Sequence, residues 1–181
     1  MEALTTRDEF YAFTGMTLPE DRVDLLLDIA SGIVRARCGW HIAPSVTETL
    51  TVDGSGSSLL ALPTLHLTAL SSVTEDGEVV DLDDVQWSTV GLLTRATAWT
   101  TRLNGVSATI THGHTTAPAA VVGIVLMAAA RASASPTGVV REQVGEFSVT
   151  YSQHSPNQAG GVVLLEHEQR VLERYSISNP A

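Results

Sequence analysis

The chain has 181 residues, of which 44% are hydrophobic and 17% charged, and its formal net charge is −10 because 20 acidic residues outnumber 10 arginines, with no lysine present. This composition lies on the globular side of the boundary with disordered chains, and the length is sufficient to bury a substantial core. An acidic surface repels phosphate, which argues against sequence-specific nucleic-acid binding. The single cysteine, Cys38, excludes an internal disulfide and fits a protein made in the cytoplasm.

Neither a secretory signal nor a membrane span is expected. Residues 1–7 contain no basic region followed by an apolar stretch. The longest apolar segment without a charge covers residues 118–130, well short of the ~20 residues that a spanning helix needs. We therefore expect no membrane partner.

Two helices are predicted at the start of the chain. Over residues 5–13, Thr5 and Thr6 offer capping oxygens and Gly15 supplies a stop. Over residues 19–38, apolar side chains recur at helical spacing and form one core face: Val23, Leu26, Leu27, Ala30, Ile33 and Val34. Leu25 and Ile29 widen this face beyond what a surface helix needs, so we predict that they contact a neighbouring subunit.

Residues 46–112 change to short β-rich runs that are separated by turn residues. The predicted strands cover residues 46–52, 59–62, 70–74, 78–80, 91–94 and 107–111. Asp76-Gly77 is the strongest hairpin signal among them, because a tight primed turn needs positive φ and this pair tolerates it. The pattern predicts a meander of hairpins.

The last third of the chain returns to helix. Residues 118–134 are apolar on all sides, which predicts a central helix, and residues 146–152 alternate as a half-buried strand does. A glycine-containing linker over residues 155–161 then leads to an amphipathic helix supported by a Glu166–Arg170 pair. The expected fold is α+β: a small helical bundle around a central apolar helix, with an inserted β-hairpin meander and a C-terminal docking helix. We divide it into a core domain, residues 1–154, and a linker with the terminal helix and tail, residues 155–181.

Histidines offer the main candidate for a chemical site. His112-Gly113-His114 is the one tight pair, and on an extended strand both rings would point to the same side, as in a two-histidine metal clamp. A strand-ending turn with two polar rings is the favoured interpretation, because spacing reveals no third ligand and Cys38 stands alone beside Trp40 and His41.

Other motifs give no chemistry. There is no G-x-S-x-G sequence, and Gly54-Ser55-Gly56 is not followed by the lysine or helix of a phosphate loop. The carboxylates of Asp81, Asp83 and Asp84 fit a solvated turn better than a calcium loop. Trp40, Trp87 and Trp99 are expected in the core. The sequence therefore predicts a protein that is not an enzyme and has no catalytic residues, metal or cofactor.

The order of the motifs resembles that of the head-to-tail adaptor (connector) proteins of long-tailed phages. The resemblance covers residues 18–176. It is carried by Arg37-Cys38-Gly39-Trp40-His41-Ile42, Leu62-Pro63-Thr64-Leu65-His66-Leu67, Ser72-Val73 before Asp76-Gly77, Gly91-Leu92-Leu93, Thr109-Ile110-Thr111-His112-Gly113 before Pro118, Gly145-Glu146-Phe147-Ser148-Val149 and Leu172-Glu173-Arg174-Tyr175.

This resemblance implies a virion protein of the phage neck. It implies a ring, usually twelve-fold, between the portal and a stopper or tail, with a central channel through which DNA passes without sequence-specific binding. The residues that match the portal-contacting part are Leu164, Leu165, Arg170, Val171, Leu172, Arg174 and Tyr175. We expect this terminal segment to become ordered on docking, and a chain cut after Gly161 to stay folded without binding the portal.

Two alternatives stay open at this point. The nearer one is another neck component, such as a stopper or tail terminator, since its composition would be the same. The more distant one is a small metal-dependent enzyme or ligand-binding domain that uses His112 and His114.

Overall fold

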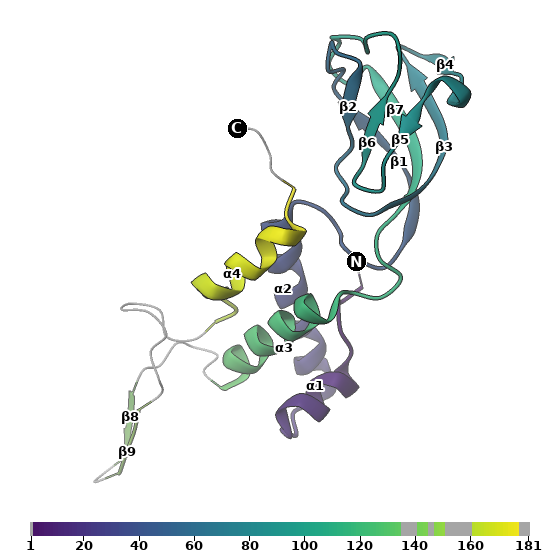
Figure 1. Ribbon diagram of the computed structural model, residues 1–181. Coiled ribbons are helices and arrows are strands. Elements are labelled where there is room, and N and C mark those ends of the chain that lie inside the picture. The colour runs from purple at the N-terminus through teal and green to yellow at the C-terminus, as the bar shows by residue number, and fades with distance from the viewer. Residues whose placement is uncertain (1, 135–140, 145–146, 151–160, 178–181) are drawn as a thin grey trace. The chain divides into compact units, whose positions relative to one another are not determined.

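The computed structural model describes residues 2–134, 141–144, 147–150 and 161–177. These residues have a mixed α/β fold, and the chain divides into two compact units. Residues up to Cys38 and from Ala117 to Arg174 form a helical unit, and Gly39–Thr116 with the residues from Tyr175 onward form a β unit. Figure 1 shows helices α1 to α4 in the first unit and strands β1 to β7 in the second.

The first helix, α1 (Arg7–Thr14), is capped as its sequence predicts. The Thr6 hydroxyl accepts the Glu9 N–H, the Glu9 carboxylate accepts the Thr6 N–H at 2.8 Å, and Gly15 ends the helix with φ 64°. The helix begins at Arg7 rather than Thr5 because Thr6 is the capping residue. Hydrogen bonds from Thr5, and then from Thr6, lower the pKa of Glu9.

The helical unit is arranged around α2 (Glu20–Cys38) and α3 (Ala119–Ala134). The α3 helix contacts α1, α2 and α4 (Glu166–Leu172), and a short 3-10 turn, Glu173–Tyr175, follows α4. Buried side chains of α3 lie on several of its sides: Val121, Ile124, Val125, Leu126, Ala128, Ala129, Ala132 and Ser133. Packing against three other helices explains why this sequence is apolar all round.

The β unit contains two antiparallel sheets. The four-stranded sheet has the order β1 (Val46–Val52), β7 (Val106–His112), β3 (Leu67–Glu75) and β4 (Glu78–Val80). The three-stranded sheet has the order β2 (Leu59–Ala61), β6 (Leu92–Thr94) and β5 (Gln86–Trp87), and a 3-10 turn, Leu82–Asp84, precedes β5.

The predicted meander is wrong, although the predicted strand positions are close. Within these two sheets, chain neighbours pair only as β3 with β4 and β5 with β6, whereas β1 pairs with β7 and Thr47 lies opposite Thr111. A local pattern places a strand but does not choose its partner, which depends on the buried faces that come together. The Asp76-Gly77 turn is confirmed, because both residues have positive φ, 53° and 91°.

The core of the β unit is apolar, and β7 contributes an alternating row to it. Val106, Ala108, Ile110 and His112 are buried, while the residues between them are half-buried. Other core residues come from both sheets and the loops: Leu60, Leu62, Leu67, Val73, Val85, Leu93 and Trp99. His112 thus occupies the last inward position of a core strand.

Two of the three tryptophans are buried as expected. Trp40 and Trp99 are 7% and 2% exposed, whereas Trp87 on β5 is 42% exposed. The Trp40 indole N–H donates to the Tyr175 carbonyl oxygen at 2.7 Å, which ties the chain after α4 to the start of the β unit.

Strand β9 (Phe147–Thr150) confirms part of the predicted strand and pairs with β8 (Arg141–Val144), which was not predicted. Residues 146, 151 and 152 of that prediction, and linker residues 155–160, lie outside the described residues. So does the boundary drawn after residue 154, and that division stays a prediction. Among the described helices, none is long and apolar enough to cross a membrane.

Candidate interaction surfaces and a histidine cluster

The C-terminal helix α4 is fastened to α3 by a buried ion pair. Glu168 is 1% exposed, and its two carboxylate oxygens accept hydrogen bonds from Arg131 at 2.7 and 2.8 Å. The same carboxylate accepts the Leu165 N–H at 2.8 Å, and Arg131 also donates to the Val163 carbonyl oxygen at 2.8 Å. This two-point geometry is the strong form of a salt bridge, and it joins α4 to α3.

This ion pair is not among the contacts predicted from the sequence, although one signal pointed to it. Arg131 is the single charged residue of the otherwise apolar α3. A charge on a helix that is buried on several sides requires a partner, because an unpaired buried charge is costly. The sequence does not reveal which carboxylate is that partner.

The seven residues predicted to bind a portal divide into an inner and an outer group. Leu172 is fully buried and Leu164 is 8% exposed, so these two belong to the core of the helical unit. Leu165 and Tyr175 are half-buried. The outward-facing members are Arg170 and Val171 of α4 and Arg174 of the 3-10 turn that follows it, and we call these three residues the α4 outer face.

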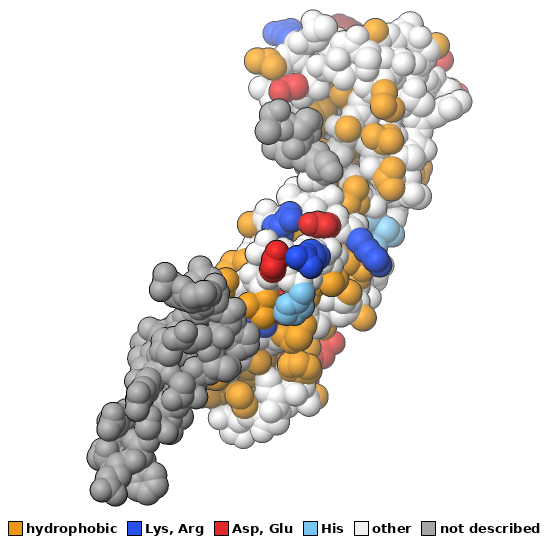
Figure 2. All heavy atoms as spheres, turned by 60° about the vertical axis from the view of Figure 1, so that its left-hand side comes forward, with side chains coloured by type: hydrophobic (Ala, Val, Ile, Leu, Met, Phe, Trp, Pro, Cys, Tyr) orange, Lys and Arg blue, Asp and Glu red, His pale blue; other side chains and the backbone are white. Residues whose placement is uncertain are grey.

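The α4 outer face is rich in charge. The predicted Glu166–Arg170 pair is confirmed, with a nitrogen–oxygen distance of 3.0 Å, and Val171 is 41% exposed beside it. Figure 2 shows arginine and acidic side chains gathered next to apolar ones on the side of the molecule that carries α4. Leu172 is fully buried, so a chain cut after Gly161 would lose this packing and expose apolar surface of the helical unit. That the truncated chain stays folded remains a prediction.

The second predicted surface lies on α2. Leu25 is 60% exposed and Ile29 is 43% exposed, whereas Val23 and Leu27 on the inner side are buried. The apolar arc of α2 therefore does extend beyond the surface that the helical unit covers. Contact of Leu25 and Ile29 with another subunit stays a prediction.

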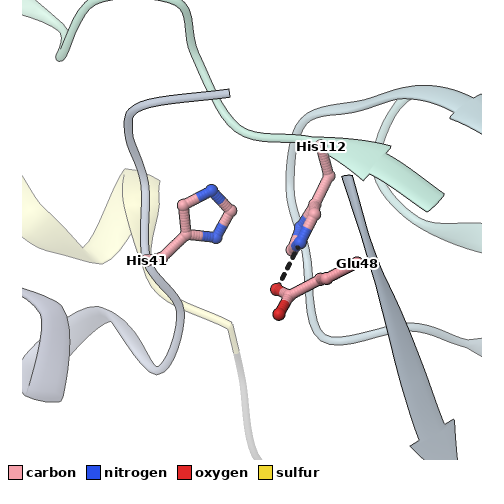
Figure 3. A group of neighbouring side chains, drawn as sticks. All are labelled: His41, Glu48 and His112. Carbon is pink, nitrogen blue, oxygen red and sulfur yellow. Dashed lines mark hydrogen bonds and ion pairs between the residues drawn. The ribbon is translucent and has the colours of Figure 1, made fainter. Parts of the chain in front are cut away.

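A histidine cluster lies in the β unit, and its main members come from three separate segments. His41 follows α2, Glu48 belongs to β1 and His112 ends β7 (Figure 3). His112 Nε2 lies 2.8 Å from a Glu48 carboxylate oxygen, and the His41 and His112 rings meet edge to face with centroids 4.4 Å apart. One possible ligand atom from each residue lies within 4.8 Å of the other two.

The alternative site built on His112 and His114 is not the one that the structure forms. His114 packs against His66, with ring centroids 4.1 Å apart, and it is not part of the group of His41, Glu48 and His112. Gly113 between the two residues has φ 95°, so the chain turns there and the alternation of an extended strand ends. Burial, and then the nearby His66, lower the pKa of His114.

Gly113 also allows the cluster to form. A Cβ at this position would lie 2.3 Å from His41 Nε2 and 2.8 Å from the Pro44 carbonyl oxygen. His41 Nε2 itself lies 3.0 Å from that oxygen, which holds the ring in place. Glycine is required both for the positive φ and for the close approach of the His41 ring.

Comparison with known proteins gives information about the fold. No protein-family model matches the sequence, and neither does any curated protein. Among solved structures, a chain from the neck of a native GTA particle, computed with C12 symmetry, matches with a TM-score of 0.61 and 12% sequence identity, over 96% of this chain and 89% of that chain. A chain from the neck of an empty GTA particle, computed with C6 symmetry, matches with a TM-score of 0.59 and 12% identity, over 96% of this chain and 90% of that one.

The protein shares its fold with these two neck chains. The similarity extends over nearly the full length of both partners, so it includes the order of the helices and the inserted strands. At 12% identity it shows the fold and not the function.

Proposed function

We propose that this protein is a structural component of a phage-type particle neck, acting as a head-to-tail adaptor that joins the portal to a stopper or tail. The observation that carries the proposal is the fold shared with two neck chains over 96% of the sequence. The resemblance of the sequence motifs to phage adaptor proteins points to the same role independently. The protein would then reside in the virion after synthesis in the host cytoplasm.

The proposed assembly is a ring of twelve copies. One matching structure was computed with C12 symmetry and the other with C6 symmetry, and both symmetries are compatible with a ring of twelve. A closed ring repeats one heterologous contact around its axis, so that each interface can be small. Leu25 and Ile29 are our candidates for this contact, since they are exposed apolar side chains on a helix whose other face is buried.

The proposed portal contact is the α4 outer face, with Leu165 and Tyr175 at its margin. Leu164 and Leu172 contribute indirectly, because they are buried where α4 contacts α2 and α3. An exposed valine flanked by arginines can combine apolar contact with pairing to acidic groups on a partner. The helix is therefore in place before docking in this proposal, rather than being formed by it.

The charge of the chain fits a conduit for DNA. With a net charge of −10 per chain, an adaptor ring would repel phosphates and so would let DNA pass through the channel without binding it. Such a role requires no catalytic residue and no cofactor.

A second candidate is a different neck component, a stopper or a tail terminator. It is supported by the same observation, because the matching chains come from particle necks and a shared fold at 12% identity does not distinguish one neck component from another. Binding partners distinguish the two roles. An adaptor binds the portal directly, whereas a stopper or terminator binds only once the adaptor is present.

The test is electron microscopy of the protein mixed with the portal of the same particle. We expect a second ring stacked on the portal ring, and we expect Val171→Asp to prevent the stacking. Val79→Asp is the matched control, because Val79 is an exposed valine of the β unit, and it should leave the stacking intact. Absence of stacking with the wild-type protein would contradict the adaptor role, and loss with Val79→Asp alone would place the portal contact on the β unit.

A further inference from the structure

The group formed by His41, Glu48 and His112 has a feature that the adaptor role does not use: three side chains of types that bind metals, two of them far in sequence from the third, meet at one point. Glu48 and His112 are 64 residues apart in the chain, and His41 lies at the beginning of the β unit. We propose that these three residues bind a divalent transition-metal ion, most favourably zinc, and that the ion fastens the two ends of the β unit to β1.

The geometry requires little rearrangement. Bonds of about 2.0–2.1 Å from a tetrahedral zinc ion place its ligand atoms about 3.3 Å apart. Here the possible ligand atoms lie within 4.8 Å of one another, and the closest pair, His112 Nε2 and a Glu48 oxygen, is at 2.8 Å. Small rotations of the side chains are enough to bring all three onto one ion.

The ligand types select the metal. Two imidazoles with one carboxylate are a common zinc set, whereas calcium and magnesium prefer oxygen ligands alone. Glu48 is 48% exposed, so the group is open to solvent on one side. This opening gives an entry path and room for a water molecule as the fourth ligand.

The two histidines are already held in position. The bond between His41 Nε2 and the Pro44 carbonyl oxygen is the kind of outer contact that orients metal-binding histidines. His112 is 2% exposed and lies in the inward row of β7, so its ring has little freedom. Fixed side chains lose little entropy when a metal binds.

His112 also has a nitrogen that the rest of the described structure leaves unused. Its Nδ1 is buried and has no hydrogen-bond partner among the described residues. If zinc takes the place of the proton between Nε2 and Glu48, the ring proton moves to Nδ1, which has no partner among the described residues either before or after the metal binds. Ligation at Nε2 therefore breaks no hydrogen bond except the one to Glu48, which the metal replaces.

The proposed consequence is structural. His41 lies where the chain enters the β unit and His112 lies close to where it leaves, so one ion would link both ends to the edge strand β1. An ion that binds the folded form and not the unfolded one stabilises the fold in proportion to the logarithm of its concentration.

The test is calorimetric titration of zinc chloride into the untagged full chain, after treatment with a chelator and dialysis at neutral pH. We expect about one zinc ion per chain and a higher melting temperature with zinc, and no such effect with calcium chloride. Glu48→Gln keeps the size and a hydrogen-bond acceptor, so it should fold, and it should weaken zinc binding by about 10-fold or more.

Two control variants make the result decisive. Glu78→Gln removes an exposed carboxylate from β4 in the same sheet and should leave zinc affinity unchanged. His114→Gln removes the histidine that lies outside the proposed ligand set and should also leave it unchanged. The proposal is overturned if the wild-type chain shows no saturable zinc binding, if Glu48→Gln binds zinc as tightly as the wild type, or if His114→Gln abolishes binding.

Discussion

The helical unit and the β unit are stabilised by different interactions. In the helical unit, a buried charged pair, Arg131 with Glu168, joins α3 to α4 beneath an otherwise apolar interface. The β unit also has a largely shielded ion pair, Arg95 with Glu75 at 2.7 Å, but its core is apolar and hydroxyl pairs cross the outer side of the sheet between β1 and β7. These pairs are Thr47–Thr111, Thr49–Thr109 and Thr51–Ser107, at 2.7, 2.9 and 3.0 Å.

The difference shows how each unit achieves a unique arrangement. Apolar packing tolerates sliding of a helix, whereas a two-point ion pair has one geometry, and our hypothesis is that Arg131 and Glu168 specify where α4 lies. In the β unit, the alternation of β7 sets the register of the strand, because a shift by one residue would expose the buried row from Val106 to His112. Substitutions in each unit can test this contrast.

The largest effect is expected for Arg131→Met. This substitution keeps the apolar part of the side chain but leaves Glu168 buried without its partner, and we expect the free energy of unfolding to fall by about 3–5 kcal/mol. Arg170→Met, which breaks the exposed pair with Glu166, is the control and should cost about 0.5 kcal/mol or less. Urea denaturation followed by circular dichroism measures both, and equal losses would contradict a special role for the buried pair.

A similar loss is expected in the β unit from Leu93→Ala. Leu93 is fully buried among core residues that come from both sheets. Truncating it leaves a cavity, which should lower the free energy of unfolding by about 2–5 kcal/mol. Its neighbour Leu92 points outward and is 37% exposed, so Leu92→Ala should cost about 1 kcal/mol or less. Thermal unfolding of the two variants compares them directly, and the reverse order would show that β6 has the opposite register.

The smallest effect is expected at the start of α1, where Thr6→Ala removes the capping hydroxyl and should lower the free energy of unfolding by about 1 kcal/mol.

The same cap makes the stability of the chain depend on pH. Hydrogen bonds lower the pKa of Glu9 in the folded chain, so the unfolded chain binds its proton first as the solution becomes acidic, and the stabilisation by Glu9 is present above the unfolded pKa of about 4.3 and lost below it.

Comparing Glu9→Gln with the wild type measures this contribution. The variant should be less stable near pH 7, and the difference should shrink as the pH is lowered through 4. Glu78→Gln, at an exposed strand position, should show no such change. A difference for Glu9→Gln that stays constant from pH 7 to pH 3 would show that the carboxylate charge does not matter at this cap.

Much of the local structure could be predicted from the sequence because its causes are local. Helical spacing located α2 and α3 to within a residue at each end, and the Thr6–Glu9 capping box lies within four consecutive residues. Alternation and turn residues located β1 and β4, including the Asp76-Gly77 turn between β3 and β4. Exposure of Leu25 and Ile29 also follows from the width of the apolar arc on α2.

The tertiary structure alone decided which segments meet. Pairing of β1 with β7, the contact between Glu48 and His112, and the ion pair of Arg131 with Glu168 all join residues that are 37 or more positions apart. No periodicity connects such residues, and the entropy lost on closing a loop of that length depends only weakly on which partner is chosen. The choice is made by burial of the apolar faces and by the need to pair each buried charge, and both are properties of the folded chain as a whole.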